Sequence, residues 1–217
     1  FAFDPVLNRP LDGVYHYVAA LEMQRYLHDT GVTKEQCARV VVKNRRNALM
    51  NPEAAYGADL NIRTVIDSPV VSSPLNRLDI SQHADGAVVL VLAAEEVVSS
   101  LSGKPVWIEG LGWISDSPSL ESRDWTTSVS TRMAAEMAFR QAGMNVKDID
   151  FAEINDEYSY KELQHMESIG LCQPGEAAFL LDSGETSPGG SIPVNVSGGS
   201  LGVGHLFECS GAHKLAE

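Results

Sequence analysis

The sequence predicts an α/β fold, and three apolar runs with one helical pattern between them carry this prediction. Residues 87–93 are a continuous apolar run, residues 106–114 are strand-like, and a shorter apolar run follows at 149–154. Residues 127–143 carry apolar side chains at helical spacing. The order strand, helix, strand is typical of layered α/β proteins.

The first third of the chain predicts helices followed by an irregular excursion. Apolar residues recur at helical spacing over 14–28, and Gly31 ends this helix. Thr33 and Gln36 resemble a capping box that opens a second helix. For the basic patch at 43–47, a solvated helix end is favoured over ligand binding. Three X-Pro pairs within 50–79 predict an irregular segment with short helices.

Composition excludes several classes of function. The net charge of −13 over 217 residues disfavours binding to nucleic acid. No apolar run reaches the roughly 18 residues that cross a bilayer, so we expect a cytoplasmic protein without a membrane partner. Cys37, Cys172 and Cys209 lie far apart, which predicts neither a metal site nor disulfides, and each is expected to be a small buried hydrophobe.

A polar cluster follows the predicted strand at 149–154. Ligands in α/β proteins bind at the carboxyl ends of strands, so this position favours function. The Asn155 amide is suited to hold a water or a carbonyl oxygen, with a turn or helix cap as the alternative. Asp156 and Glu157 are candidate acid/base carboxylates, although helix capping is favoured. Tyr158 is a reserve proton donor that is otherwise expected to pack.

A glycine-dense loop ends in a histidine. Such a loop permits positive φ angles and close approach of backbone to a ligand, and its glycines are Gly198, Gly199, Gly202 and Gly204. Their spacing is not that of a dinucleotide loop. His205 is suited to act as a base or to donate to a developing oxyanion, and the loop favours this over a structural role. A thiolate–imidazole pair between His205 and Cys209 is less favoured than a buried thiol.

Four segments occur in a fixed order: 26–48 (YLHDTGVTKEQCARVVVKNRRNA), 85–92 (DGAVVLVL), 152–163 (AEINDEYSYKEL) and 195–205 (NVSGGSLGVGH). Together they resemble the thiolase superfamily, in particular sterol-carrier-protein-x-like and archaeal thiolases. The resemblance implies layered α/β/α halves of a thiolase-like fold that is incomplete here. Residues 1–100 would be the end of the N-terminal half with its loop excursion, and 103–217 most of the C-terminal half.

The resemblance also implies roles for particular residues. Asn155 would help to form an oxyanion hole, and His205 would activate a nucleophilic cysteine and line an oxyanion hole. Leu206 and Glu208 stand where the family has a proline and a glycine, and the Asn155 motif also departs from the family pattern. The backbone of the loop would contribute Gly198, Gly199 and Gly204.

The family's catalytic cysteines are not matched by any cysteine of this sequence. By resemblance, the nucleophilic cysteine lies upstream of Phe1 and the second catalytic cysteine lies past Glu217. The sequence is therefore expected to be part of a longer protein, and these 217 residues alone are expected to be inactive.

The implied reaction is thiolytic cleavage of a 3-oxoacyl-CoA or its reversal, a Claisen condensation. Coenzyme A would be a co-substrate, with no covalently bound cofactor. One rival is retro-aldol cleavage of a 3-hydroxyacyl-CoA with Tyr158 as acid/base, which the unusual residues 155–158 motivate. Another is a non-catalytic acyl-CoA-binding subunit. The resemblance further implies a homodimer and a small OB-fold/zinc-ribbon partner subunit.

Overall fold

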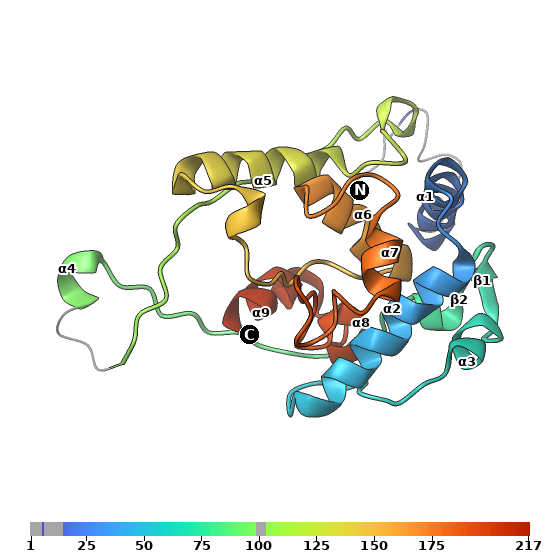
Figure 1. Cartoon of the computed structure of the whole chain (residues 1–217), viewed down its shortest axis with the longest axis horizontal. Coiled ribbons are helices and arrows are strands. Elements are labelled where there is room, and N and C mark those ends of the chain that lie inside the picture. The colour runs from blue at the N-terminus through green and yellow to red at the C-terminus, as the bar shows by residue number, and fades with distance from the viewer. Residues whose placement is uncertain (1–5, 7–14, 99–102) are drawn as a thin grey trace.

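A computed structural model of the protein describes residues 6, 15–98 and 103–217 (Figure 1). The first predicted helix is confirmed as α1 (Tyr15–Thr30), although its predicted start at residue 14 lies outside the described residues. Gly31 follows α1 with a φ of 75°. The capping box is also confirmed, because Thr33 accepts from the Gln36 N–H at 3.2 Å and donates its own N–H to Gln36 Oε1 at 2.9 Å.

The second helix, α2 (Lys34–Asn47), is the centre of the molecule. It packs against α3 (Ile62–Ile66), α6 (Ser159–Ile169), α7 (Ala177–Asp182) and α8 (Gly199–Val203). Figure 1 shows α2 passing beside segments from both ends of the chain. Fully buried side chains of the core include Met23, Tyr26, Cys37, Val40, Leu163 and Met166. The prediction of a buried thiol is therefore confirmed for Cys37.

The irregular excursion after α2 is confirmed. It contains the 3-10 turn η2 (Ala48–Met50), α3, a short hairpin of β1 (Val70–Ser72) and β2 (Leu75–Asn76), and the 3-10 turn η3 (Arg77–Asp79). The hairpin is antiparallel, with Val70 opposite Asn76 and Ser72 opposite Leu75. Within 15–98 and 103–217 it forms the one sheet of the chain.

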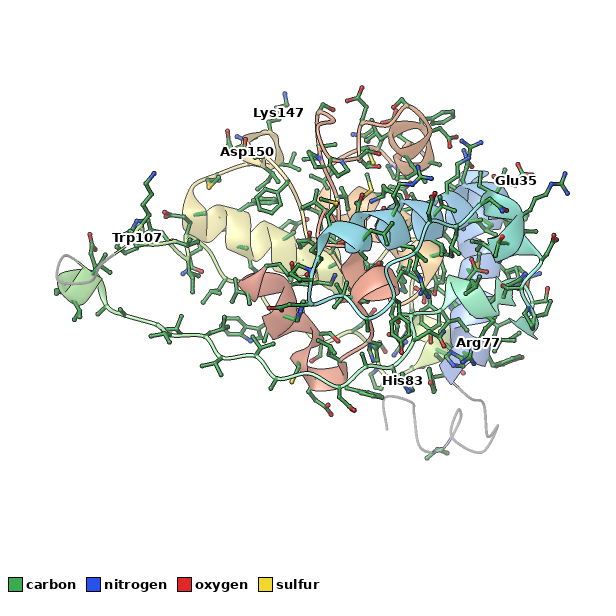
Figure 2. The ribbon with its side chains drawn as sticks, turned by 90° about the horizontal axis from the view of Figure 1, so that it is seen from below. Glu35, Arg77, His83, Trp107, Lys147 and Asp150 are labelled. Carbon is green, nitrogen blue, oxygen red and sulfur yellow. The ribbon has the colours of Figure 1, made fainter. Side chains whose placement is uncertain are left out.

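The three predicted strands are extended but form no ladder, so the prediction that 87–93 is a strand buried on both faces is wrong for this chain. Val89 and Val91 are 85% and 89% exposed, and Val106 is 94% exposed. A strand needs a neighbouring backbone to satisfy its N–H and C=O groups, and within the described residues no strand lies beside 87–93 or 106–114. The segments on either side of α4 (Glu95–Val98) extend away from the helical body, with Trp107 exposed there (Figures 1 and 2).

The remaining elements lead to the candidate motifs. The helix predicted at 127–143 is confirmed as α5 (Val129–Ala142). The backbone before it passes close to α5, since a Cβ on Gly112 would lie 1.9 Å from the Ala134 carbonyl oxygen. The 3-10 turns η4 (Leu120–Ser122) and η5 (Val146–Asp148) flank α5. Residues 149–154 then run to α6, and Ala152 forms an isolated parallel bridge with Val194.

The last part of the chain contains the glycine-dense loop and a helical tail. The loop contains α8, and the tail consists of the 3-10 turn η6 (Phe207–Cys209) and α9 (Ser210–Ala216). No helix found in 15–98 or 103–217 combines the length and the apolar character needed to span a bilayer. The predicted domain boundary near residue 100 falls in 99–102, outside the described residues.

Candidate functional site

One short segment, residues 80–84, contacts both motifs singled out in the sequence; we call it the joining segment. At its start, Ile80 forms an isolated antiparallel bridge with Tyr158. The next residue, Ser81, donates its N–H to the Glu157 carbonyl oxygen at 2.8 Å. These two contacts fix the backbone that leads into α6.

The far end of the joining segment holds the histidine of the glycine-dense loop. His83 and His205 form a parallel bridge, in which the His205 N–H donates to the Gln82 carbonyl at 2.7 Å and the Ala84 N–H donates to the His205 carbonyl at 3.1 Å. The His83 and His205 rings lie 5.9 Å apart. Sequence reasoning missed His83, which lies at the edge of the molecule in Figure 2, because no local pattern marks the joining segment.

The His205 ring has a buried nitrogen and an aromatic neighbour. Its Nδ1 is buried and has no hydrogen-bond partner among the described residues. The Phe207 ring packs against the imidazole with centroids 4.9 Å apart, in an edge-on arrangement. His205 is thus an oriented imidazole beside a second histidine, which suits a proton-transfer or oxyanion-binding group.

The glycines of the loop allow it to pack closely against the protein itself. A Cβ on Gly198 would lie 2.5 Å from the Cβ of Ala48, and one on Gly204 would lie 2.6 Å from the Cβ of Ala84. Both glycines have positive φ angles, 112° and 123°. The backbone freedom predicted for ligand binding is therefore also required for the fold, and the oxyanion role of these glycines stays a prediction.

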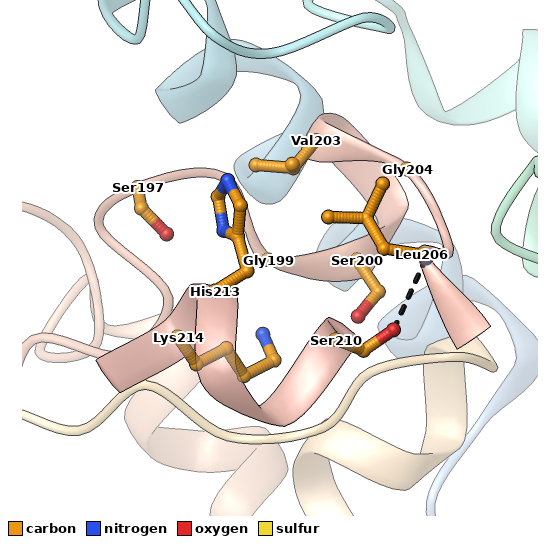
Figure 3. Close-up of a pocket in the computed structure, with 9 residues that line it drawn as sticks. All are labelled: Ser197, Gly199, Ser200, Val203, Gly204, Leu206, Ser210, His213 and Lys214. Carbon is orange, nitrogen blue, oxygen red and sulfur yellow. Dashed lines mark hydrogen bonds between the residues drawn. The ribbon is translucent and has the colours of Figure 1, made fainter. Parts of the chain in front are cut away.

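The inner side of the loop is closed. Ser210, His213 and Lys214 of α9 cover it, and Ser210 Oγ accepts the Leu206 N–H at 3.1 Å (Figure 3). The cavity enclosed there measures about 10 Å³, which is at the lower limit for a single water.

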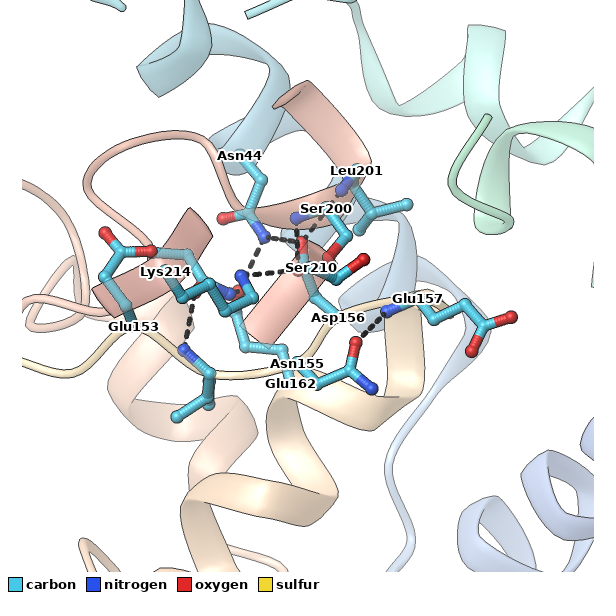
Figure 4. A network of polar contacts seen from close by, with 12 residues as sticks. Asn44, Glu153, Asn155, Asp156, Glu157, Glu162, Ser200, Leu201, Ser210 and Lys214 are labelled. Carbon is cyan, nitrogen blue, oxygen red and sulfur yellow. Dashed lines mark hydrogen bonds and ion pairs between the residues drawn. The ribbon is translucent and has the colours of Figure 1, made fainter. Parts of the chain in front are cut away.

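Asp156 is a fully buried anchor for this loop (Figure 4). Its carboxylate accepts the N–H groups of Ser200 and Leu201 at 2.5 and 3.1 Å, and the Asn44 amide at 2.8 Å. The Lys214 ammonium lies 3.5 Å away. This arrangement matches the capping alternative, except that Asp156 caps α8 and not α6, and it gives no support to the acid/base role.

The prediction that the patch at 43–47 is a solvated helix end is wrong for Lys43, Asn44 and Arg45, which are buried, while Arg46 is exposed as predicted. Lys43 and Asn44 are buried, and the Lys43 ammonium lies 3.0 Å from the Glu162 carboxylate. The side-chain amides of Asn44 and Asn195 donate to the same carboxylate at 2.6 and 2.8 Å. Burial raises the pKa of Glu162, while the neighbouring Lys43 opposes this effect. The basic patch forms a buried framework for the loop.

Asn155 is exposed at the turn before α6. Its Oδ1 accepts the Glu157 N–H at 3.1 Å, which is the turn geometry that the sequence left open. It borders a pocket of about 270 Å³ that includes Lys161 and His165. No hydrogen bond joins Asn155 to His205 in the described structure, so the two predicted residues are not brought into direct contact.

Tyr158 lies at the start of α6 with its side chain 6% exposed. Its hydroxyl is 3.1 Å from Nδ1 of His16, and the two rings meet edge to face with centroids 5.9 Å apart. Burial raises the pKa of Tyr158 and lowers the pKa of His16, so both side chains are neutral near pH 7. Sequence reasoning missed His16, because a histidine in an amphipathic helix carries no signal of its own.

A pocket of about 440 Å³ lies beside this pair. His16, Ile80, Ser81 and His83 contribute to its wall, so the joining segment separates it from the glycine loop. Its size is within the range of small-molecule pockets. The contact of Tyr158 with His16 and the ring contact of His205 with His83 thus both lie along the joining segment.

The cysteines supply no nucleophile at this place. Burial raises the pKa of Cys37, and it raises the pKa of Cys172 to about 12. Cys209 makes no hydrogen bond to His205 in the described part of the chain. Across 15–98 and 103–217, no group of three or more His, Cys, Asp and Glu side chains is arranged to hold a metal ion.

Comparison with known proteins agrees with this fold and these motifs. Residues 112–217 match the family described as thiolase C-terminal domain-like. The chain is 35% identical to the benzoylsuccinyl-CoA thiolase subunit BbsB of Thauera aromatica, over 91% of the chain and 51% of that protein. It is 33% identical to the acetyl-CoA acetyltransferase of Methanothermobacter thermautotrophicus, over 91% of the chain and 52% of that protein.

Solved structures agree as well. The Ltp2-ChsH2(DUF35) aldolase superposes with a TM-score of 0.80 at 27% identity, over 92% of this chain and 53% of that one. The fold class is thus α/β and thiolase-like. The chain belongs to the thiolase superfamily. It spans about half the length of the curated relatives it matches.

Proposed function

We propose that this chain belongs to an enzyme that breaks or makes a carbon–carbon bond beside a coenzyme A thioester, by thiolytic acyl transfer on a 3-oxoacyl-CoA. The observation that carries the proposal is the imidazole of His205 at the end of a buried glycine loop, where its backbone is paired with the joining segment. The similarity to a thiolase subunit and to an acetyl-CoA acetyltransferase supports the same class of reaction.

In this proposal His205 accepts the proton of a cysteine thiol that lies outside these 217 residues. The resulting thiolate attacks the 3-oxo carbon, the C2–C3 bond breaks, and its electron pair goes to the enolate of the departing acyl-CoA. The charge on the enolate oxygen requires preorganised donors. His205 is one, and Asn155 is the second, since its Oδ1 is taken by Glu157 while its Nδ2 remains for an oxygen.

The test is loss of 3-oxoacyl-CoA absorbance with and without free coenzyme A, in the full-length protein together with any small partner subunit. We expect His205→Ala and Asn155→Ala each to lower kcat by about 10²–10³-fold, which is the usual effect of removing an oxyanion donor. His28→Ala is the matched control, because His28 is 80% exposed on α1. Full activity in His205→Ala would contradict the proposal.

A second candidate reaction is retro-aldol cleavage of a 3-hydroxyacyl-CoA. The contact between Tyr158 and His16 favours it, because this reaction needs a base for the 3-hydroxyl proton and an acid for the enolate. The structural similarity to an aldolase supports it too. In this route no acyl-cysteine forms, and the pair at the 440 Å³ pocket supplies the proton transfers.

The two reactions are separated by their products. Release of an aldehyde or ketone from a 3-hydroxyacyl-CoA, lowered in Tyr158→Phe and unchanged in the exposed control Tyr17→Phe, would establish the aldolase. An acyl-enzyme trapped on a cysteine would instead establish the thiolase. Binding of acyl-CoA without turnover of either substrate would identify a non-catalytic acyl-CoA-binding subunit.

We also propose that the enzyme works as a homodimer with a small OB-fold/zinc-ribbon partner subunit. Support comes from two similar proteins, one named as a thiolase subunit and the other solved as an Ltp2-ChsH2(DUF35) assembly. Size-exclusion chromatography with light scattering, before and after adding the product of any neighbouring small gene, measures both. A monomer that gains neither activity nor mass would contradict the proposal.

A further inference from the structure

Of the pair formed by His16 and Tyr158, His16 is the one that faces the pocket. His16 belongs to the wall of the 440 Å³ cavity, whereas Tyr158, 6% exposed, does not. The Tyr158 hydroxyl lies behind it and contacts Nδ1 at 3.1 Å. A ligand in this pocket therefore meets the imidazole before the phenol, and Nε2 is the ring nitrogen left for the ligand.

The protonation state suits a base. Burial lowers the pKa of His16, which keeps the ring neutral near pH 7, and burial raises the pKa of Tyr158, which keeps its hydroxyl protonated. When Nδ1–H donates to the phenol oxygen, the lone pair is on Nε2. This is the tautomer in which His16 accepts a proton from the pocket side.

The surrounding charges tune this base from several elements. The negative charge of Glu157 raises the pKa of His16, so it stabilises the imidazolium that forms when a proton arrives. His83 and Arg77, which line the same pocket, lower the pKa of His16. Around Tyr158, the groups that raise its pKa in addition to burial are Glu157, Tyr15 and Glu22.

We propose that His16, not Tyr158, exchanges the proton with the substrate, and that Tyr158 is a positioning residue that fixes the tautomer of His16. The proposal rests on the retro-aldol candidate function. His16 Nε2 takes the 3-hydroxyl proton, the O–H electron pair becomes the carbonyl bond, and the C2–C3 bond breaks to leave the enolate of the acyl-CoA. The imidazolium then returns its proton to C2, so His16 ends neutral and no other reactant is needed.

The experiment uses the full-length protein with any partner subunit and a 3-hydroxyacyl-CoA. We expect His16→Gln and His16→Asn to lower kcat by about 10²–10⁴-fold with little change in KM, as for loss of a general base. His16→Asn keeps an amide where Nδ1 meets Tyr158, so it separates loss of the base from loss of packing. Tyr158→Phe removes one hydrogen bond and should cost about 10-fold. His28→Gln, on the exposed face of α1, is the control.

The pH profile provides a readout that a merely structural role would not move. In the wild type, kcat should fall as the pH falls through the pKa of His16, below the usual 6.5. The acid limb should move in Tyr158→Phe and disappear in both His16 variants. If the His16 variants keep the wild-type kcat and acid limb, or if Tyr158→Phe loses more activity than they do, the role of His16 is overturned while the retro-aldol function stands. A wild type that binds acyl-CoA without cleaving the 3-hydroxy substrate would overturn the retro-aldol function and this role with it.

Discussion

Replacement of Gly199 by alanine tests how firmly the glycine loop is anchored. In the folded protein Gly199 has a φ of 58°, and a Cβ there would lie 2.3 Å from Oδ2 of Asp156. The carboxylate is fully buried and bonded to the N–H groups of Ser200 and Leu201, to Asn44 and to Lys214. It has no free side to which it could move without losing a partner.

The magnitude follows from these contacts. The left-handed backbone costs an alanine about 1–2 kcal/mol. Moving the carboxylate far enough to admit a methyl group breaks at least one of its hydrogen bonds, and a bond to a charged group contributes about 1.5–3 kcal/mol. We therefore expect Gly199→Ala to lower the free energy of unfolding by about 2.5–5 kcal/mol.

Urea denaturation followed by circular dichroism measures this loss as a shift of the midpoint. Gly143→Ala is a matched control, because Gly143 has a φ of 66° and no atom within 4 Å of an added Cβ. It carries the backbone cost alone, about 1–2 kcal/mol. Equal losses in the two variants would refute the anchoring of the loop by Asp156.

Three further predictions concern buried groups. Glu162→Gln leaves the Lys43 ammonium, 7% exposed, beside a neutral amide; we expect a loss of about 3–5 kcal/mol in urea denaturation, and a change below about 1 kcal/mol would contradict a buried ion pair. Burial lowers the pKa of His165 from 6.5 to about 3, so its contribution to stability is present above about pH 6.5 and is lost as the pH falls towards 3. The difference in unfolding free energy between wild type and His165→Gln should change with pH across that range. A difference that does not change with pH would argue against a buried neutral ring. Cys37 should resist iodoacetamide in the native protein and react in urea, as followed by peptide mass spectrometry, because it is fully buried with a raised pKa; native labelling as fast as that of Cys209 would contradict this burial.

The helices were predictable because their signals are local. The capping box at Thr33 and the glycines that end α1, α5 and α6 act within one or two turns of the chain. The strands were predicted from composition alone, yet residues 87–93 form no ladder, because strand pairing depends on a partner distant in sequence. Apolar periodicity does not identify that partner.

From the sequence, candidate site residues could be singled out only where they stand at a turn or a glycine-rich loop. Asn155 and His205 were singled out because one stands at the turn after a predicted strand and the other ends a glycine-dense loop, and their roles stay predictions. The joining segment and His16 were missed, since their roles arise from contacts such as Ile80 with Tyr158 that no sequence pattern records. Likewise, Lys43 was taken for a surface charge because its partner, Glu162, lies far along the chain.

The Asn44 amide donates to Asp156 at 2.8 Å and to Glu162 at 2.6 Å, and this double contact bears on which residues can be substituted during evolution. Through this one side chain, the turn that carries Tyr158 and the loop that carries His205 are held to α2 at a fixed spacing. Residues at the pocket wall, such as His16, take no part in that bracing. Substitutions of residues at the pocket wall, such as His16, therefore leave the contacts of Asn44 with Asp156 and Glu162 in place, so the chemistry of the pocket can change without a change of fold.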